Sequence, residues 1–192
     1  MYNISKLIQN YNDLSDKQMK SLELIQNVTQ HFGNMEIDKA RELVEEALVF
    51  TEQLGPFIER KVTLAAAGDI YSVLKRHAES AKFYEDALKI GIQYDKMDVD
   101  MMLSLGNEYS SQNLLIEAKE AYDMALDTAG RLNNMELKAR SLANIASVLA
   151  RQGNKVESLN YFTQAKKLFE QEKNDEMLNR MSAAIEHYEL TK

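Results

Sequence analysis

The sequence predicts an all-α fold of stacked helical hairpins, and two features carry this prediction. The first is a repeat: four similar segments place alanines 40, 38 and 40 residues apart, at Ala47, Ala87, Ala125 and Ala165. The second is the spacing of apolar residues, which recur every three or four positions and show no sustained strand-like alternation. A hairpin of this length cannot bury its apolar face alone and must stack on its neighbours, as in an α-solenoid.

Each repeat is predicted to be a helix, a tight turn and a second helix. The expected repeats cover about residues 15–55, 56–96, 97–134 and 135–174. Their internal turns are predicted at Gly33-Asn34, near Lys75-Arg76, at Gln112-Asn113 and at Gly153-Asn154. Glycine and asparagine tolerate the left-handed backbone conformation that ends a helix, so three of these four turns have a physical reason.

Small and large residues alternate between the two helices of each repeat. Small residues stand on the first helices at Gly68, Gly106 and Ala146, and aromatic or branched residues stand on the second helices at Val44, Tyr84, Tyr122 and Phe162. A large side chain against a small one allows helices to pack closely. We expect Tyr122 to pack against the first helix of the following repeat, near Ala146.

The two ends of the chain are amphipathic. Residues 175–192 are predicted to form a C-terminal capping helix, because a solenoid needs an end with a polar outer face. Residues 1–14 carry apolar residues at helical spacing, at Ile4, Leu7, Ile8 and Tyr11. This N-terminal segment either caps the other end or enters the groove of its own or a neighbouring chain.

Residues Leu103 to Leu126, LSLGNEYSSQNLLIEAKEAYDMAL, resemble a tetratricopeptide repeat (TPR). Residues 15–174 repeat this pattern four times, with Val28 and His31 departing from it in the first copy. The spacing exceeds the usual length of about 34 residues, so the chain is similar to a long-helix variant of the family. The resemblance implies a right-handed α-solenoid of four hairpins.

In this family the first helices line a concave groove that receives an extended peptide or a partner helix. Carried over by motif, the ligand-groove residues are Leu22, Ile25, Phe32, Val62, Asp69, Leu103, Asn107, Ser110, Arg140, Asn144, Ser147 and Arg151. The resemblance implies that Asn107 and Asn144 pair with a peptide backbone, since an amide both donates and accepts. Arg140 and Arg151 could bind a carboxylate. Alternatively, Asn107 serves packing and the arginines pair with local acids.

Composition and motifs argue against catalysis. The net charge of −7 disfavours nucleic acid and anionic membranes as partners, and the absence of cysteine excludes disulfide and thiolate chemistry. The three histidines fall in different repeats without paired carboxylates, and His31 is expected to be a packed residue. No phosphate-binding glycine motif or nucleophile motif is present. We therefore expect no enzyme activity, no metal and no cofactor, and a cytoplasmic location without a signal peptide or membrane span.

These observations predict a non-enzymatic module that binds a protein or peptide segment in the groove. One alternative is a regulator or receptor of a signalling peptide, similar to the Gram-positive peptide-pheromone receptors. Residues 1–14 are too short for the effector domain that those receptors add. Another alternative is a self-associating structural homo-oligomer.

Overall fold

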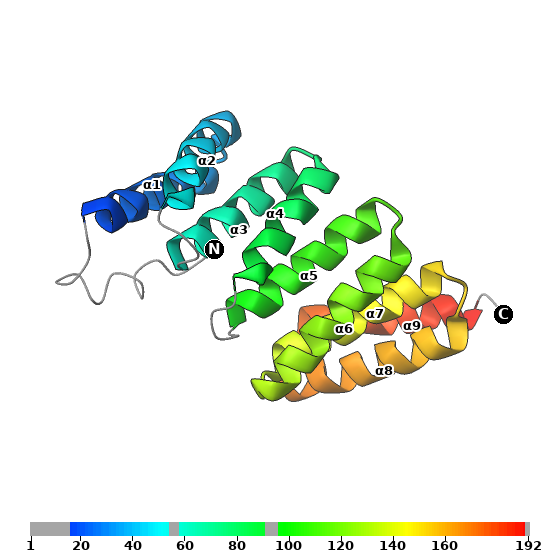
Figure 1. The fold of residues 1–192 in the computed structure, drawn as a ribbon. Helices are drawn as coiled ribbons and strands as arrows, with labels where there is room; N and C mark the ends of the chain where they lie inside the picture. The colour runs from blue at the N-terminus through cyan, green and yellow to red at the C-terminus, as the bar shows by residue number, and fades with distance from the viewer. Residues whose placement is uncertain (1–15, 54–57, 91–95, 191–192) are drawn as a thin grey trace. The chain divides into compact units, whose positions relative to one another are not determined.

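The computed structural model describes residues 16–53, 58–90 and 96–190, which form nine α-helices and no β-strand (Figure 1). The all-α prediction is therefore confirmed. The chain divides into two compact units, Met1–Gln93 (unit 1) and Tyr94–Lys192 (unit 2). The predicted N-terminal segment 1–14 lies outside the described residues, as does Pro56.

Unit 1 contains two antiparallel hairpins. The first consists of α1 (Asp16–Gly33) and α2 (Ile37–Glu52), and the second of α3 (Ile58–Val73) and α4 (His77–Lys89). Buried apolar residues from α1, α2 and α3 form one cluster: Val28, Ala40, Val44, Ala67, Ile70 and Tyr71. The first hairpin, the least regular copy in sequence, thus shares a core with the second.

Unit 2 contains two further hairpins and a last helix. The hairpins are α5 (Lys96–Ser111) with α6 (Leu115–Arg131), and α7 (Met135–Arg151) with α8 (Lys155–Gln171). The last helix, α9 (Asp175–Leu190), falls in the segment predicted as a cap and packs on α8. Its Met181 joins a core cluster with α7 and α8 residues that include Ala146, Phe162 and Phe169.

One turn geometry connects the helices of the hairpins. The backbone N–H after a left-handed residue donates to the carbonyl five positions earlier, as from Arg76 to Tyr71 and from Leu114 to Tyr109, both at 2.9 Å. The left-handed residues, with φ between 51° and 82°, are Met35, Lys75, Asn113, Asn133, Gly153 and Lys173. In the first hairpin the prediction was wrong by one to two positions, because Met35 takes this conformation and not Gly33 or Asn34. Hydrogen bonding of the helix end therefore overrides residue preference there.

Large and small residues pair within a hairpin. A Cβ added to Gly106 would come within 3.0 Å of ring atoms of Tyr122, and one added to Gly68 would lie 2.7 Å from the Tyr84 ring. The ring of Tyr122 therefore covers Gly106 of its own hairpin, a contact that the sequence did not predict. Its predicted packing near Ala146 of the next hairpin stays a prediction. A glycine is needed there because the aromatic ring packs directly against the helix backbone and leaves no room for a Cβ.

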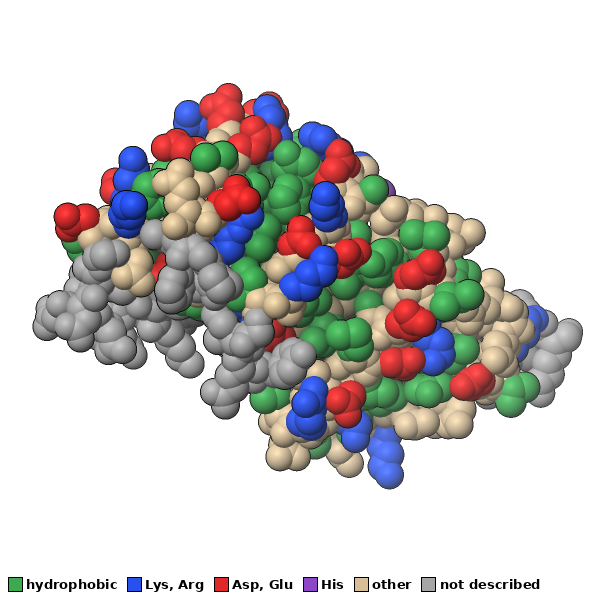
Figure 2. All heavy atoms as spheres, in the orientation of Figure 1, with side chains coloured by type: hydrophobic (Ala, Val, Ile, Leu, Met, Phe, Trp, Pro, Cys, Tyr) green, Lys and Arg blue, Asp and Glu red, His purple; other side chains and the backbone are tan. Residues whose placement is uncertain are grey.

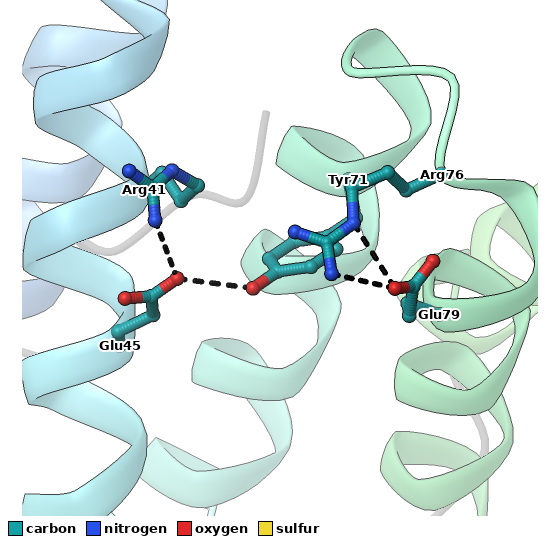
Figure 3. Close-up of polar contacts among 5 residues, drawn as sticks. All are labelled: Arg41, Glu45, Tyr71, Arg76 and Glu79. Atoms are coloured by element: carbon teal, nitrogen blue, oxygen red, sulfur yellow. Dashed lines mark hydrogen bonds and ion pairs between the residues drawn. The ribbon is translucent and has the colours of Figure 1, made fainter.

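A polar network joins the two hairpins of unit 1 (Figure 3). The Tyr71 hydroxyl of α3 donates to Glu45 Oε1 of α2 at 3.0 Å, and Arg41 contacts the same oxygen at 3.0 Å. Burial, followed by the bond to Glu45, raises the pKa of Tyr71. The guanidinium of Arg76 lies 4.6 Å from the centre of the Tyr71 ring and pairs with Glu79. The network fixes the register of α2 on α3 inside this unit.

The surface of the molecule mixes charges of both signs. Figure 2 shows acidic and basic side chains interspersed with apolar ones on the face in view. Several pairs are neighbours along one helix, such as Lys119 with Asp123 at 2.8 Å and Arg131 with Asp127 at 3.2 Å. Such exposed pairs contribute at most about 1 kcal/mol each, so the core dominates stability.

Candidate functional site

The predicted groove residues that remain accessible in unit 2 lie along one side of α5 and α7. At helical spacing, α5 presents Asp100, Ser104, Asn107 and Ser111, and α7 presents Arg140, Asn144, Ser147 and Arg151. All eight side chains are partly or fully exposed. We call this surface the α5–α7 face. It is polar throughout, with two amides near its middle.

Two arginines connect α7 to α5 across this face. Arg140 Nη1 donates to Asp100 Oδ1 at 2.9 Å, and the two residues occupy the same position in successive repeats. Arg151 donates to the Ser110 carbonyl at 3.0 Å and to the Ser110 hydroxyl, and also to Asn113 Oδ1 at 3.0 Å. Both guanidinium groups thus already have partners on α5. This favours the interpretation that the arginines serve local pairing and not capture of a carboxylate.

Asn107 is held from below by Tyr122. The Tyr122 hydroxyl on α6 donates to Asn107 Oδ1 at 2.7 Å. Burial raises the pKa of Tyr122 above its ordinary value, while nearby Arg151 acts in the opposite direction, so the hydroxyl stays protonated and remains a donor at neutral pH. With its oxygen engaged, the exposed amide of Asn107 presents its two N–H donors to solvent.

Asn144 is not the repeat equivalent of Asn107. Counted from the small residues Gly106 and Ala146, the equivalent of Asn107 is Ser147, which donates to the Ala143 carbonyl at 2.9 Å. Asn144 stands three positions earlier on the same side of α7 and is partly exposed. Within the described residues its side chain makes no hydrogen bond, so its donors and acceptor are both available.

Four of the apolar residues predicted to line the groove are buried: Leu22, Ile25, Val62 and Leu103, with exposed fractions of 3%, 1%, 2% and 2%. In this structure they belong to the packed core and not to an accessible surface. Leu103 stands three positions before the small residue Gly106, and Ile25, Ala65 and Ala143 at the same repeat position are also buried. Three residues of α-helix correspond to about 300°, so this position lies only about 60° around the helix from the small residue at the helix–helix contact. Its side chain therefore also faces the packed interior.

The remaining predicted residues of unit 1, Phe32 and Asp69, are partly exposed. Asp69 Oδ1 accepts a hydrogen bond from the Tyr84 hydroxyl at 2.6 Å. The second and third hairpins therefore hold a predicted groove residue in the same way: a tyrosine hydroxyl donates to an acid in one and to an amide oxygen in the other. His31, expected to be packed, is instead partly exposed and contacts Glu36.

A pocket of about 470 Å³ that was not predicted from the sequence lies between α6, α7 and α8 of unit 2. One signal in the sequence points to it. Gly130 is the next-to-last residue of α6, and a Cβ added there would meet no atom within 4 Å. We call this cavity the α6–α8 pocket.

Metal and membrane sites were searched among the described residues. In that part of the chain, no group of three or more acidic, histidine or cysteine side chains could hold a metal ion. Across the same residues, none of the helices combines the length and the hydropathy that a bilayer span requires.

Comparisons with known proteins identify the repeat. The sequence of residues 63–90, which covers most of α3 and α4, matches the family model described as tetratricopeptide repeat. No curated protein matches the sequence significantly.

The fold matches several solved structures. The apo form of RapI is 17% identical with a TM-score of 0.82, over 97% of this chain and 52% of that one. A signal-transduction ATPase with a tetratricopeptide repeat sensor from Pyrococcus horikoshii is 15% identical with a TM-score of 0.80, over 94% and 28%. Kinesin light chain repeats from Podosopora anserina are 12% identical with a TM-score of 0.71, over 89% and 85%.

These likenesses concern the fold, and this chain spans about half the length of the RapI chain. The family match and the hairpin geometry agree on the type of repeat. Residues 63–90 therefore match a tetratricopeptide repeat, and the described helices share the fold of solved structures with such repeats.

Proposed function

We propose that this chain is a non-enzymatic interaction module and that its α5–α7 face binds an extended segment of a protein or peptide. The observation that carries the proposal is the contact of Tyr122 with Asn107 at 2.7 Å, which holds an exposed amide in one orientation. A donor that is fixed before binding loses little conformational freedom when a ligand arrives.

The chemistry of the face suits a peptide backbone. An extended segment offers alternating carbonyl and N–H groups whatever its side chains are. Asn107 offers donors, and Asn144 on the adjacent helix offers donors and an acceptor. The two arginine bridges, Arg140–Asp100 and Arg151–Ser110, hold α5 and α7 together on either side of the amides. Backbone recognition between two such bridges would tolerate many ligand sequences.

The competing interpretation is that Asn107 exists only to satisfy the Tyr122 hydroxyl. Two observations support a binding role beside this one. Asn107 is exposed, and its N–H groups are not needed by the tyrosine. Asn144 has no equivalent of the Tyr122 hydroxyl to satisfy, since the residue at that repeat position in its own hairpin is Phe162.

A substitution that separates packing from binding is Asn107→Asp. The aspartate keeps an acceptor for Tyr122, as Asp69 does for Tyr84, but removes the two N–H donors. Peptides would be selected from a displayed random library against the full chain, and their affinities measured by calorimetry. We expect Asn107→Asp combined with Asn144→Ala to weaken the selected peptide by roughly 1–3 kcal/mol, with unchanged helicity.

The matched control is Asn179→Ala, which removes an exposed amide from α9. It should leave peptide affinity unchanged. If the double variant and this control bind the peptide equally well while both remain folded, the α5–α7 face is not the binding surface.

A second candidate is a sensor of a signalling peptide within a regulatory system. It is supported by the likeness to the ATPase whose repeats are described as a sensor. Self-association is the third possibility. Light scattering of the full chain with and without the selected peptide distinguishes self-association from the other two possibilities. A structural oligomer has a higher mass without any ligand, whereas a binding module or a sensor gains only the mass of the bound peptide.

A further inference from the structure

The α6–α8 pocket combines apolar walls with a cationic rim. Its apolar surface comes from Leu126 of α6, Leu142 of α7 and Tyr161 of α8, all of which belong to or pack against one core cluster. Polar and charged groups complete it, namely Asp127, Arg131, Lys138 and Gln164. A volume of about 470 Å³ falls in the range of known small-ligand sites, about 300–1,000 Å³.

The charges around the pocket leave one cation uncompensated. Asp127 pairs with Arg131 at 3.2 Å, so these two charges largely offset each other. Lys138 also lines the pocket and is exposed, and within the described residues its ammonium has no carboxylate or hydrogen-bond partner. The chain as a whole has a net charge of −7, so an exposed cation without an acidic partner is a local exception to its overall charge. An anion bound in the pocket could therefore form an ion pair with the Lys138 ammonium.

Tyr161 adds a second polar group to an otherwise apolar wall. Its ring is partly buried against the core cluster. Within the described part of the chain, its hydroxyl makes no hydrogen bond. Phenol hydroxyls at apolar surfaces usually find a partner, because their burial without one is costly. A ligand oxygen would supply it.

We propose that the α6–α8 pocket binds an anionic ligand in which a carboxylate stands beside an apolar group. The apolar group lies on Leu126, Leu142 and the Tyr161 ring, and the carboxylate pairs with Lys138. Lys138 and Leu142 stand about 120° and about 160° around α7 from Asn144. The pocket is therefore separate from the α5–α7 face, and this proposal does not depend on the one for that face.

The test titrates 3-phenylpropionate into the full ¹⁵N-labelled chain and follows amide chemical shifts. We expect shifts at residues 126–131, 138–142 and 161–164, and binding about tenfold tighter than that of the uncharged 3-phenylpropan-1-ol. Lys138→Gln should weaken the acid about tenfold and leave the alcohol unchanged. Lys167→Gln removes an exposed charge outside the pocket and should change neither.

A second pair of variants tests the cavity itself. Gly130→Leu fills the pocket from α6 and should abolish binding of both compounds, whereas Gly130→Ala should preserve it, because only the larger side chain reaches across the cavity. Circular dichroism and the melting temperature establish that each variant is folded.

The source of the carboxylate is distinguished by acetyl-Gly-Gly-Phe with a free and with an amidated C-terminus. Binding of the free tripeptide alone would assign the pocket to the end of a polypeptide, and failure of both peptides would assign it to a free carboxylic acid. Equal binding of acid and alcohol, equal effects of Lys138→Gln and Lys167→Gln, or shifts outside the pocket would overturn the proposal.

Discussion

The two hairpins of unit 2 fill the same space between their helices with different pairs of residues. In α5–α6, the ring of Tyr122 lies on Gly106, and its hydroxyl reaches Asn107 at the surface. In α7–α8, the equivalent residues are Phe162 and Ala146, with exposed fractions of 3% and 0%. Where the first helix carries one more methyl group, the aromatic residue lacks the hydroxyl.

The two hairpins of unit 2 also differ at the position four residues before the aromatic residue. Ser158 of α8 donates to the Ala146 carbonyl at 2.8 Å, while α6 has the buried Ala118 at the equivalent position. The α3–α4 hairpin of unit 1 combines both features, since Ser80 donates to the Gly68 carbonyl and Tyr84 donates to Asp69. The comparison teaches that the glycine–tyrosine pair links the core to an exposed polar residue, whereas the alanine–phenylalanine pair serves packing alone.

The largest expected effect comes from removing the ring. Tyr122→Ala and Phe162→Ala should each cost roughly 3–5 kcal/mol in the free energy of unfolding, as large-to-small changes in a core. Denaturant unfolding of the two variants measures this. A loss below about 1 kcal/mol for Tyr122→Ala would mean that the ring does not fill this space.

The second largest effect is expected from a substitution at Gly106, where the Tyr122 ring packs on the helix backbone. Gly106→Ala should destabilise the chain by about 1–3 kcal/mol, because the added Cβ would overlap the Tyr122 ring. In the Tyr122→Ala background the same change should become stabilising by up to about 1 kcal/mol, since alanine is the better helix former.

The control for this prediction is Gly130→Ala in the same helix pair. A Cβ at that position meets open space, so only the gain in helix propensity should appear. If Gly106→Ala destabilises equally with and without the Tyr122 ring, the effect does not arise from their contact.

A smaller effect is expected from the hydroxyl alone. Tyr122→Phe converts α5–α6 to the pattern of α7–α8 and should cost about 0.5–1.5 kcal/mol, the net value of one hydrogen bond. Because the pKa of Tyr122 is raised in the folded state, the native chain favours the neutral phenol. Its contribution is complete below about pH 10, the pKa of an unfolded tyrosine, and is lost as pH rises further.

Unfolding free energies measured at neutral pH and above pH 10 test both parts of this prediction. Tyr122→Phe should lose less stability than the native chain over that interval. Identical pH dependence of the two proteins would contradict it.

The smallest effect concerns the turns of the two hairpins. The left-handed residue is Asn113 in α5–α6 and Gly153 in α7–α8, and a Cβ at Gly153 meets open space. Gly153→Ala should therefore cost about 1 kcal/mol through backbone strain alone, and Gly153→Asn about half of that, since asparagine tolerates this conformation. Thermal melts of both variants measure the difference, and equal melting temperatures would show that the turn is not strained.

The α5–α7 face could be predicted from the sequence only in part. Helical spacing correctly placed Asn107, Ser147 and Arg151 on an accessible side of their helices. It could not separate Asn107 from Leu103, because a position only about 40° away around the helix belongs to the core once a neighbour packs there. Helical spacing also could not predict the partners of Arg140 and Arg151, since Asp100 and Ser110 lie about 40 residues away from them in the chain.

The sequence by itself determined the helices, their pairing into hairpins and most of the turns. These depend on local periodicity and on residues such as Gly153 and Asn113, whose backbone preference acts within one turn of helix. Only the tertiary structure decided that Tyr122 covers Gly106 of its own hairpin, that Asn107 is held by a phenol, and that a pocket opens beside Lys138. Contacts of this kind depend on how side chains from separate helices fill a shared space, which no spacing along the chain specifies.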